Sequence, residues 1–478
     1  MLRRNFLAHQ LLGAAALSPL AAQSQTPPSP KAPPNILFIT ADDLGLQLSC
    51  YGENRIQTPN LDALAARGAR FTTAYVAQAS CSPSRSAMFT GLYPHANGQY
   101  GLTGSGFRLH EPLSPNTLPN VLRRAGYRTG ILGKLHVDPE SSFLWDFRGP
   151  DREQGRRVRL FTQLSREFMD SAKSQPFFLM VNFTDPHAFR NPAVPGGWNF
   201  PPQVEGLPTD PLPPSESTIF PFQQIDTPEQ RVRTAGYYNA VQRLDTGIGM
   251  LMQQLEASGK ADNTLIVFCG DHGPPFARGK TTVYEAGLRV PYMLHWPGVT
   301  RPNTVSPKLV STVDIMPTLL DAAGLPAPHR MHGESLRLAL GGKPWRQYLG
   351  ADFHFHGGRP FYPRRALRDQ RFQIIHNLRA GQAKPSTGID GDPAYRLSRL
   401  DRFNGTGVRK AFDTFADPPE YELYDTQQDA IAFDNLAGRP EHARTLRRLQ
   451  AALLDWRKAT DDPFLDPAFL ARFAEGGA

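Results

Sequence analysis

The chain has little cysteine. Cys50, Cys81 and Cys269 are its only cysteines among 478 residues. Such a small and odd number excludes a disulfide framework, and we interpret Cys50 and Cys269 as small core residues. The 40% hydrophobic and 20% charged content is typical of a globular protein. A chain of this length predicts one large unit and a smaller one.

The sequence also lacks an apolar run long enough to span a bilayer. The run at residues 11–20 is too short for a stable transmembrane helix. Arg3 and Arg4 precede it in R-R-N-F-L, a pattern typical of a twin-arginine export signal. We therefore predict a signal peptide at residues 1–24 of an exported bacterial protein, periplasmic or secreted, without stable membrane insertion. A retained N-terminal anchor is the alternative.

Nucleic-acid-binding motifs and internal repeats are missing as well. No nucleic-acid partner is therefore expected. The net charge is +8 at pH 7 and the isoelectric point is about 9.4. A mild positive excess suits a polyanionic substrate, although it is diluted over so long a chain.

The most informative stretch that is present begins at Cys81 and reads C-S-P-S-R-S-A-M-F-T-G-L-Y-P. By composition, the chance that any of the three cysteines begins a C-x-P-x-R match is on the order of 2%. Pro83 suits the first turn of a helix and Ser82 can cap it. A reactive cysteine is one interpretation, and a buried unreactive cysteine before a proline turn is the other.

Two predicted buried strands end in carboxylates. The apolar run N-I-L-F-I-T at residues 35–40 leads to Asp42 and Asp43, and T-L-I-V-F-C at residues 264–269 leads to Asp271. Open α/β sheets place ligands at the carboxyl ends of their strands. Three carboxylates there favour a Ca²⁺ or Mg²⁺ site. Taken alone, each of the segments A-D-D-L-G and G-D-H-G that follow these strands is more simply interpreted as a turn.

The alternation of apolar strands with helices predicts an α/β fold, a mostly parallel sheet with helices on both faces. Residues 176–183 form another expected strand, and helices are expected at residues 61–67, 114–125 and 313–323. A proline-rich linker is predicted at residues 25–34. The main domain is then expected at residues 35–345.

A smaller C-terminal α+β subdomain is expected at residues 346–478. Its predicted antiparallel strands lie at residues 365–369, 371–378 and 421–425, and a terminal amphipathic helix is predicted at residues 440–458.

Within the main domain, residues 185–229 are rich in proline and aromatic residues and show no periodicity. A loop this long is usually functional, so we expect it to form part of a substrate-binding rim.

Further segments complete a family pattern. They are G-I-L-G-K-L-H-V at residues 130–137, T-D-P-H at residues 184–187, and G-K with Y-E-A-G-L-R-V-P within residues 279–291. Together with C-S-P-S-R and the acidic strand ends, they resemble the type I, formylglycine-dependent sulfatase family over nearly the whole chain after the leader. The resemblance implies an alkaline-phosphatase-like α/β fold.

The same resemblance implies the chemistry of Cys81. A formylglycine-generating enzyme would convert this cysteine to formylglycine, whose aldehyde hydrate is the family's nucleophile. Arg85 and Lys134 would hold the diol and the sulfate, and Lys280 would balance charge on the sulfuryl group. A diol allows the aldehyde to re-form and expel sulfate without attack by water on sulfur.

Two histidines take proton-transfer roles in the resemblance. His187 would protonate the leaving group, and His136 would deprotonate the sulfated intermediate. Both would titrate near neutrality, the ordinary range of the side chain. Lys134 and His136 are two residues apart on a segment expected to be extended, so both side chains should point into one pocket.

The metal site implied by the resemblance is for Ca²⁺, with Mg²⁺ possible, and its ligands correspond to Asp42, Asp43, Cys81, Asp271 and His272. Most family members carry asparagine where this chain has His272. Imidazole is a softer ligand than an amide oxygen, so His272 either binds the cation weakly or contacts the sulfate instead.

The substrate is the least determined property. R-F-Q-I-I-H-N-L and W-R-K-A-T-D-D-P resemble the sulfamidase branch of the family, the N-sulfoglucosamine sulfohydrolases, whereas G-D-H-G resembles general O-sulfatases. We expect a sulfated carbohydrate substrate and exo action on a glycosaminoglycan-like chain. The alternatives are an O-sulfatase for another polysaccharide, a phosphate or phosphonate ester hydrolase of the same superfamily, and a sulfated-glycan binding protein without turnover.

Overall fold

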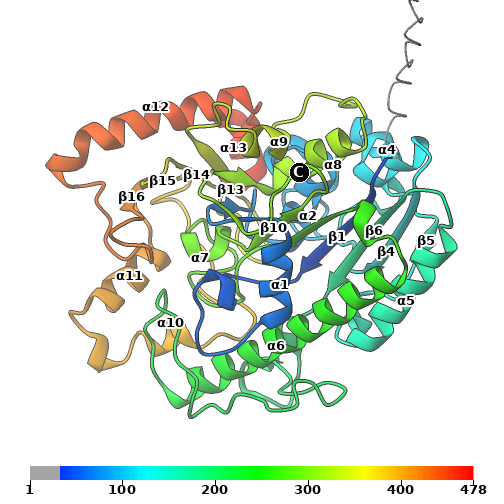
Figure 1. Cartoon of the computed structure of the whole chain (residues 1–478). Helices are drawn as coiled ribbons and strands as arrows, with labels where there is room; N and C mark the ends of the chain where they lie inside the picture. Colours follow the sequence, from blue (N-terminus) through cyan, green and yellow to red (C-terminus); the bar gives the residue numbers. More distant parts are fainter. Residues whose placement is uncertain (1–32, 477–478) are drawn as a thin grey trace, which may run out of the picture. The chain divides into compact units, whose positions relative to one another are not determined.

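The structure is a computed structural model, and it describes residues 33–476 (Figure 1). The signal peptide predicted at residues 1–24 and most of the linker predicted at residues 25–34 lie outside the described residues. Within residues 33–476, none of the helices combines the length and the apolar character that crossing a membrane requires. Export of the chain stays a prediction.

An eight-stranded sheet forms the centre of the fold. Its strands are, in spatial order, β11 (Thr304–Ser306), β2 (Ala69–Phe71), β10 (Tyr292–His295), β9 (Thr264–Gly270), β1 (Asn35–Ala41), β6 (Phe177–Phe183), β4 (Arg128–Gly133) and β5 (Phe147–Arg148). β1 runs parallel to both β9 and β6, and β10 is antiparallel to β9 and β2. The prediction of a mostly parallel α/β sheet is confirmed.

Both faces of this sheet are covered, which explains why its central strands are apolar throughout. On β1, Leu37 and Ile39 face one core, whereas Ile36 and Phe38 face the other. The first core is closed by α1 (Pro59–Arg67), α5 (Val158–Ser171) and α6 (Pro228–Ala257). The second is closed by α2 (Cys81–Thr90), α4 (Leu118–Arg124) and α8 (Ile315–Ala322). Figure 1 shows α5 and α6 together along one side of the sheet.

Two of the helices predicted in the main domain begin later than expected. The helix predicted at residues 114–125 starts at Leu118, after a 3₁₀ helix over Glu111–Asn116. Proline has no amide proton, so Pro115 disfavours a continuous α-helix there, while Pro119 is tolerated in the first turn of α4. The helix predicted at residues 313–323 is α8, which likewise follows a short 3₁₀ turn.

Apart from the C-terminal sheet and the long helix that packs on it, the other α-helices and strands are short. They are α3 (Pro94–Asn97), α7 (Glu285–Leu288), α9 (Leu336–Leu340), α10 (Ala394–Leu397), α11 (Gly407–Ala416), α13 (Pro467–Ala474), and two paired ribbons, β3 (Ala74–Tyr75) with β12 (Val310–Ser311) and β7 (Phe189–Arg190) with β8 (Trp198–Asn199). The β7–β8 hairpin lies in the stretch 185–229 that was expected to be loop. Strands of two residues are too short to give a sequence period.

A separate antiparallel sheet is built by the C-terminal part of the chain. It consists of β13 (Leu349–Phe353), β14 (Arg364–Arg368), β15 (Phe372–Asn377) and β16 (Tyr421–Asp425), and α12 (Ala443–Ala459) packs on it. The antiparallel prediction is confirmed, with β13 as an unpredicted fourth strand. The helix predicted from residue 440 begins at Ala443, after a 3₁₀ turn. The boundary at residues 345/346 stays a prediction, because the described residues from Pro34 onward form one contact unit.

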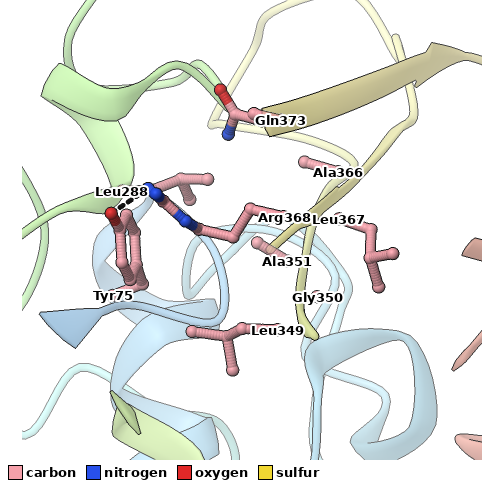
Figure 2. Close-up of a pocket in the computed structure, with 9 residues that line it drawn as sticks. All are labelled: Tyr75, Leu288, Leu349, Gly350, Ala351, Ala366, Leu367, Arg368 and Gln373. Carbon is pink, nitrogen blue, oxygen red and sulfur yellow. Dashed lines mark hydrogen bonds between the residues drawn. The ribbon is translucent and has the colours of Figure 1, made fainter. Parts of the chain in front are cut away.

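Arg368 joins this C-terminal sheet to the main core. Figure 2 shows its guanidinium pointing from β14 toward Tyr75 of β3, to which it donates a hydrogen bond, and it also pairs with Glu285 of α7. The cavity beside it measures about 10 Å³, which is room for no more than one water molecule. This pocket is therefore a packing seam and not a ligand site.

Asp462 anchors a second junction, and its replacement gives a stability prediction. Arg365 donates to its two carboxylate oxygens at 2.8 and 2.7 Å, and Arg457 donates at 2.6 Å. We expect Asp462→Asn to lower the free energy of unfolding by about 3–5 kcal/mol, since it leaves buried charge unpaired. The matched control is Asp417→Asn, whose exposed partner is Lys384 at 2.9 Å, with an expected loss below about 1 kcal/mol.

Urea unfolding of both variants measures these losses, and equal losses would contradict the buried network.

The stabilisation by Asp462 should also depend on pH, with a sign that follows from its pKa. Burial alone would raise the pKa of Asp462, but the arginines hold it well below its usual range. The stabilisation is therefore present at neutral pH and is lost as the pH falls below the ordinary aspartate pKa. The difference between wild type and Asp462→Asn should shrink in acid.

Candidate active site

The acidic strand ends meet at one edge of the main sheet. Asp42 and Asp43 directly follow β1, and Asp271 and His272 directly follow β9, its parallel neighbour in the sheet. All four side chains are buried. The amide of Asp43 donates to Oδ1 of Asp271 at 2.9 Å, so the two strand ends are joined by a direct hydrogen bond. The expected convergence of these residues is what the structure has.

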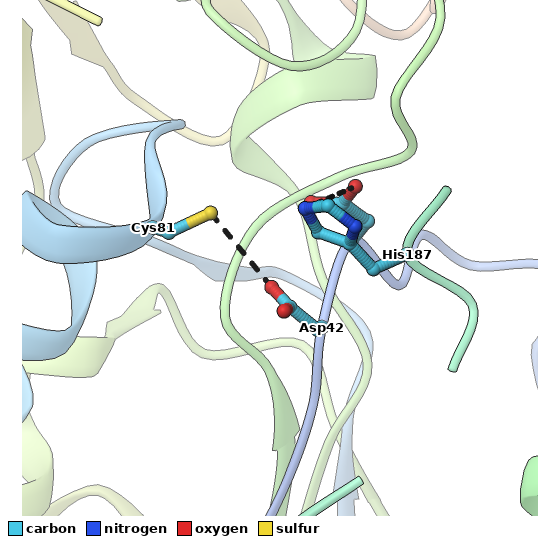
Figure 3. A group of neighbouring side chains, drawn as sticks. Asp42, Cys81 and His187 are labelled. Atoms are coloured by element: carbon cyan, nitrogen blue, oxygen red, sulfur yellow. Dashed lines mark hydrogen bonds and ion pairs between the residues drawn. The ribbon is translucent and has the colours of Figure 1, made fainter. Parts of the chain in front are cut away.

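Cys81 lies at the start of a buried helix that points at these carboxylates. It is the first residue of α2, and Ser80, not Ser82 as expected, is in the N-cap position. The Cys81 thiol is 3.8 Å from Oδ1 of Asp42 (Figure 3) and 3.2 Å from Nε2 of His272. A helix N-terminus favours negative charge, so this position suits a group that ionises.

Arg85, one turn into α2, joins three strands of the main sheet at their carboxyl ends through hydrogen bonds. Its Nε donates to Asp271 at 3.0 Å, and its Nη1 donates to the carbonyl of Lys134 at 2.8 Å and to Oδ1 of Asn182 at 2.9 Å. Within residues 33–476, its Nη2 has no hydrogen-bond partner. Asn182 was not singled out from the sequence, although a polar residue inside the apolar run of β6 was a usable signal.

The two lysines each hold one carboxylate of the β1 end. Lys134 Nζ lies 2.8 and 3.0 Å from the two oxygens of Asp42. Lys280 Nζ lies 3.0 Å from Oδ1 of Asp43 and 2.9 Å from Oδ2 of Asp390. Asp390 comes from the C-terminal part of the chain and was missed. It sits in an irregular segment, where sequence pattern gives no spatial signal.

His187 lies beside Lys280 and lines the cavity that is described below. Its Nε2 is 3.5 Å from Lys280 Nζ and 3.8 Å from Oδ2 of Asp43, and its Nδ1 bonds to the carbonyl of Ala188. Burial would lower the pKa of His187, but the Asp43 carboxylate raises it above the ordinary value. Figure 3 shows its ring beyond Asp42 as seen from Cys81.

His136 reaches the site by a bend and not along an extended segment. β4 ends at Gly133, and His136 has a φ of 56°, in the left-handed region that non-glycine residues rarely adopt. The expected alternation of Lys134 and His136 therefore does not apply, although His136 does lie beside the Cys81 thiol. Asp43 and Asp390 also have positive φ values, 67° and 41°. Such strain is common at functional sites.

Charge around Cys81 changes the acidity of the groups there. Burial by itself would raise the pKa of the Cys81 thiol, but the nearby charges of Lys134 and Lys280 hold it well below its usual range. Burial and then Lys134 lower the pKa of His136 to about 4, so the expectation that this histidine titrates near neutrality is wrong. The site therefore favours an anion at the position of residue 81 and a neutral imidazole beside it.

The donor atoms are close enough to hold a metal ion. They form two groups, each within 4.8 Å, made up of Asp42, Asp43, Cys81 and His187, and of Asp42, Cys81, Asp271 and His272. Three carboxylates supply the hard oxygen ligands that Ca²⁺ and Mg²⁺ prefer. The imidazoles and the thiol are softer donors. The residues present therefore fit a hard divalent cation, with the carboxylates as its main ligands.

A cavity of about 460 Å³ opens over this cluster. It is lined by Asp42, Arg152, Glu153, Arg156, Thr184, His187, Ala188, Phe189, Arg190 and Trp198. This volume is in the range of small-ligand sites. The buried part of the lining, with Asp42 and His187, is the floor of the cavity, and the exposed part, with Arg190 of the β7–β8 hairpin, is its mouth. Part of the stretch 185–229 therefore lines the cavity.

Residues 34–325 match the sulfatase family, and residues 270–396 match the family of N-sulphoglucosamine sulphohydrolase C-terminal domains. The chain belongs to the sulfatase family. It is 33% identical to human N-sulphoglucosamine sulphohydrolase over 469 residues, with 91% of each chain covered. It is 30% identical to a Formosa agariphila ulvan-active sulfatase over 445 residues, which covers 90% of this chain and 81% of the relative. This sulfatase-family chain is therefore a hydrolase.

Solved structures agree on the sulfatase fold. One is a protein in complex with its substrate D-glucosamine-2-N,6-O-disulfate, with a TM-score of 0.64 and 21% identity over 90% of this chain and 98% of that one. Another is a phosphonate monoester hydrolase of Agrobacterium radiobacter, with a TM-score of 0.62 and 22% identity over 89% of this chain and 96% of that one. At these identities the likeness establishes the fold alone.

Proposed function

We propose that this chain hydrolyses sulfate from a sulfated carbohydrate, with residue 81 as the nucleophile. The observation that carries the proposal is the cluster at the cavity floor. There the helix N-terminus that bears Cys81 faces Asp42, and Lys134 and Lys280 add positive charge. A sulfate ester carries diffuse negative charge, and a site of this kind stabilises further charge as it develops.

Maturation of Cys81 to formylglycine is part of the proposal, with a formylglycine-generating enzyme as the transient partner. The intact C-S-P-S-R motif supports it. The aldehyde hydrate supplies a hydroxyl for attack and a second hydroxyl for release of sulfate. A Ca²⁺ ion, or Mg²⁺, would be held by Asp42, Asp43, Asp271, His272 and residue 81. It would supply Lewis acidity toward the sulfate and the hydroxyl.

The chain's own residues then divide the remaining work. The Nη2 of Arg85 forms no hydrogen bond within residues 33–476 and lies 3.9 Å from Oδ1 of Asp42, so one donor stays available beside residue 81. Lys134 and Lys280 supply positive charge near residue 81. His187 borders the open cavity and can give a proton to the departing oxygen or nitrogen. His136, beside residue 81, can accept a proton afterwards.

Arg156 and Arg243 keep His187 in place. Arg243 binds Asp185 through two hydrogen bonds of 2.6 and 3.0 Å, and Arg156 binds the same carboxylate at 3.1 Å. Arg156 also donates to the carbonyl of His187. His187, the proposed acid, thus follows two residues after Asp185, which belongs to a buried ion-pair network. This attachment supports a fixed orientation of His187 toward the cavity.

The substrate we propose is the N-sulfated terminal glucosamine of a glycosaminoglycan-like chain, cleaved in exo fashion. The human relative named N-sulphoglucosamine sulphohydrolase and the matched C-terminal family support this choice. A cavity with a closed floor admits a chain end more readily than an internal unit. We further propose that the chain acts outside the cytoplasm after export.

An O-sulfatase on another polysaccharide is the second candidate. The ulvan-active sulfatase and a Bacteroides thetaiotaomicron N-acetylglucosamine-6-O-sulfatase, 26% identical over 559 residues, support it. A phosphonate ester hydrolase is supported by fold alone, and a binding protein without turnover would lack the aldehyde.

The test is sulfate release by protein made in a host that forms formylglycine. We expect N-sulfoglucosamine to be cleaved with a kcat/KM at least about 10-fold above that for 2-O- and 6-O-sulfated sugars, because a site built for one leaving atom discriminates strongly. Ion chromatography of released sulfate measures it. Release from O-sulfates only would replace the sulfamidase proposal with the O-sulfatase one. Cleavage of phenyl phosphonate esters with no sulfate release would overturn both.

A further inference from the structure

The β7–β8 hairpin carries a cation that the catalytic cluster does not use. Arg190 and Trp198 are paired across the two strands, and both line the cavity. The guanidinium of Arg190 lies 5.6 Å from the centre of the Trp198 ring. The Trp198 ring is 6.3 Å from the His187 ring. One short hairpin thus extends from the proposed acid to the cavity mouth.

Arg190 differs from the other arginines of the cavity in having no carboxylate partner. Arg156 is engaged by Asp185 at 3.1 Å, and Arg152 pairs with Glu153 at 3.2 Å. Within residues 33–476, the side chain of Arg190 forms neither a hydrogen bond nor an ion pair, and its guanidinium lies over the Trp198 ring. Its side chain is exposed at the mouth. It is therefore free to pair with an incoming anion.

The hairpin is fixed from the C-terminal side of the chain. A Cβ on Gly391 would lie 3.0 Å from the carbonyl oxygen of Gly196 and 3.1 Å from Cβ of Trp198, so the two segments are in tight contact. Asp392, the next residue, accepts hydrogen bonds from Gln223 at 2.7 Å and from the amide of Ala277 at 2.6 Å. A hairpin held in this way presents Arg190 in a defined position, which reduces the entropic cost of binding.

We propose that Arg190 is a specificity-determining residue that binds an acidic group on the sugar next to the sulfated one, with Trp198 as the residue that positions it. The inference rests on the proposed function. The sugar that carries the leaving atom must lie against His187, and the cavity continues from there to Arg190. A planar guanidinium matches the two oxygens of a carboxylate or a sulfate. Stacking on an aromatic ring keeps it oriented toward them.

The experiment compares kcat/KM for three disaccharides that share the same sulfated terminal sugar. The second sugar carries a carboxylate, a sulfate or no charge. We expect wild type to prefer one or both acidic disaccharides over the neutral one. Arg190→Gln should lower that ratio by about 10- to 100-fold, since a charge-assisted contact is lost, and the change should lie mainly in KM. The acidic disaccharide that wild type prefers identifies the recognised anion as a carboxylate or a sulfate.

Three further variants distinguish direct contact between Arg190 and the acidic group of the substrate from a general effect of positive charge. Arg159→Gln removes one positive charge from the start of α5, outside the cavity lining, and should leave the ratio unchanged. Trp198→Leu should lower the ratio, and Arg190→Lys should restore only part of it, because lysine lacks the planar fork. Thermal melting of each variant verifies folding.

The outcomes distinguish the two proposals. No release of sulfate from any sugar by wild type would overturn the proposed function and this inference with it. Release without preference for the acidic disaccharides would overturn the inference alone. An equal fall in kcat/KM on all three substrates in Arg190→Gln, or the same fall in Arg159→Gln, would also overturn it.

Discussion

Replacing Cys81 by alanine is expected to lower sulfate release by at least about 10⁴-fold, because loss of a nucleophile removes the covalent route and leaves only binding and charge stabilisation. The fold should persist. Cys81 is the first residue of α2, where alanine is compatible with the helix. The measurement is sulfate release by ion chromatography, together with a thermal melt within a few degrees of wild type.

Cys50→Ala is the matched control for Cys81→Ala. Cys50 is half-buried and lies in the chain close to the acidic β1 end, yet its thiol belongs to the hydrophobic core packing and not to the site. We expect it to keep activity within a few-fold of wild type. Mass analysis of the peptide that contains residue 81 should find an aldehyde in active protein. Full activity in Cys81→Ala, or active protein with an unmodified thiol, would contradict the nucleophile assignment.

Removal of divalent cations is the second change with a large expected effect. Exhaustive chelation should abolish turnover, and Ca²⁺ or Mg²⁺ should restore it, because three buried carboxylates lie close to Cys81, the proposed nucleophile. The same treatment should lower stability. A cation bound at 100 times its dissociation constant stabilises the folded state by about 2.7 kcal/mol, so the melting temperature should fall on chelation and recover with the ion.

Two substitutions test the ligands that this metal site would use. Asp271→Asn should reduce kcat by about 10²–10³-fold and weaken the rise in melting temperature with added Ca²⁺. His272→Asn should be mild, because it replaces an imidazole with a hard amide oxygen. Wild-type rates and melting temperature after thorough chelation would argue against a metal site. A severe loss in His272→Asn would argue that the imidazole contacts the sulfate.

The central strands and the residues at their ends could be predicted from the sequence. β1 and β9 are buried on both faces, so their composition is apolar along the whole length. Their positions can therefore be recognised in the sequence as short apolar runs. Parallel neighbours end at the same edge of a sheet, and this rule places Asp42 and Asp271 together without further information. The motif at Cys81 added the proposed nucleophile and Arg85, because its spacing is fixed within one turn of helix.

Other features were decided by tertiary contacts. Asp390 lies 110 residues beyond its partner Lys280 in the chain, and no local pattern encodes that contact. His136 enters the site through a left-handed bend, which alternation rules for extended chain cannot anticipate. The hairpin with Arg190 and Trp198 has strands of two residues each, too short for a period.

Three of the eight strands of the main sheet, the acidic residues after β1 and β9, and the helix that bears Cys81 could thus be predicted from the sequence. Each of them is encoded by contiguous residues with a strong pattern. The tertiary structure alone decided which distant groups pair with the lysines, how the histidines approach, and what lines the cavity mouth. The physical reason is that regular elements follow from local periodicity. Irregular segments are fixed only by the neighbours that satisfy their charges and hydrogen bonds.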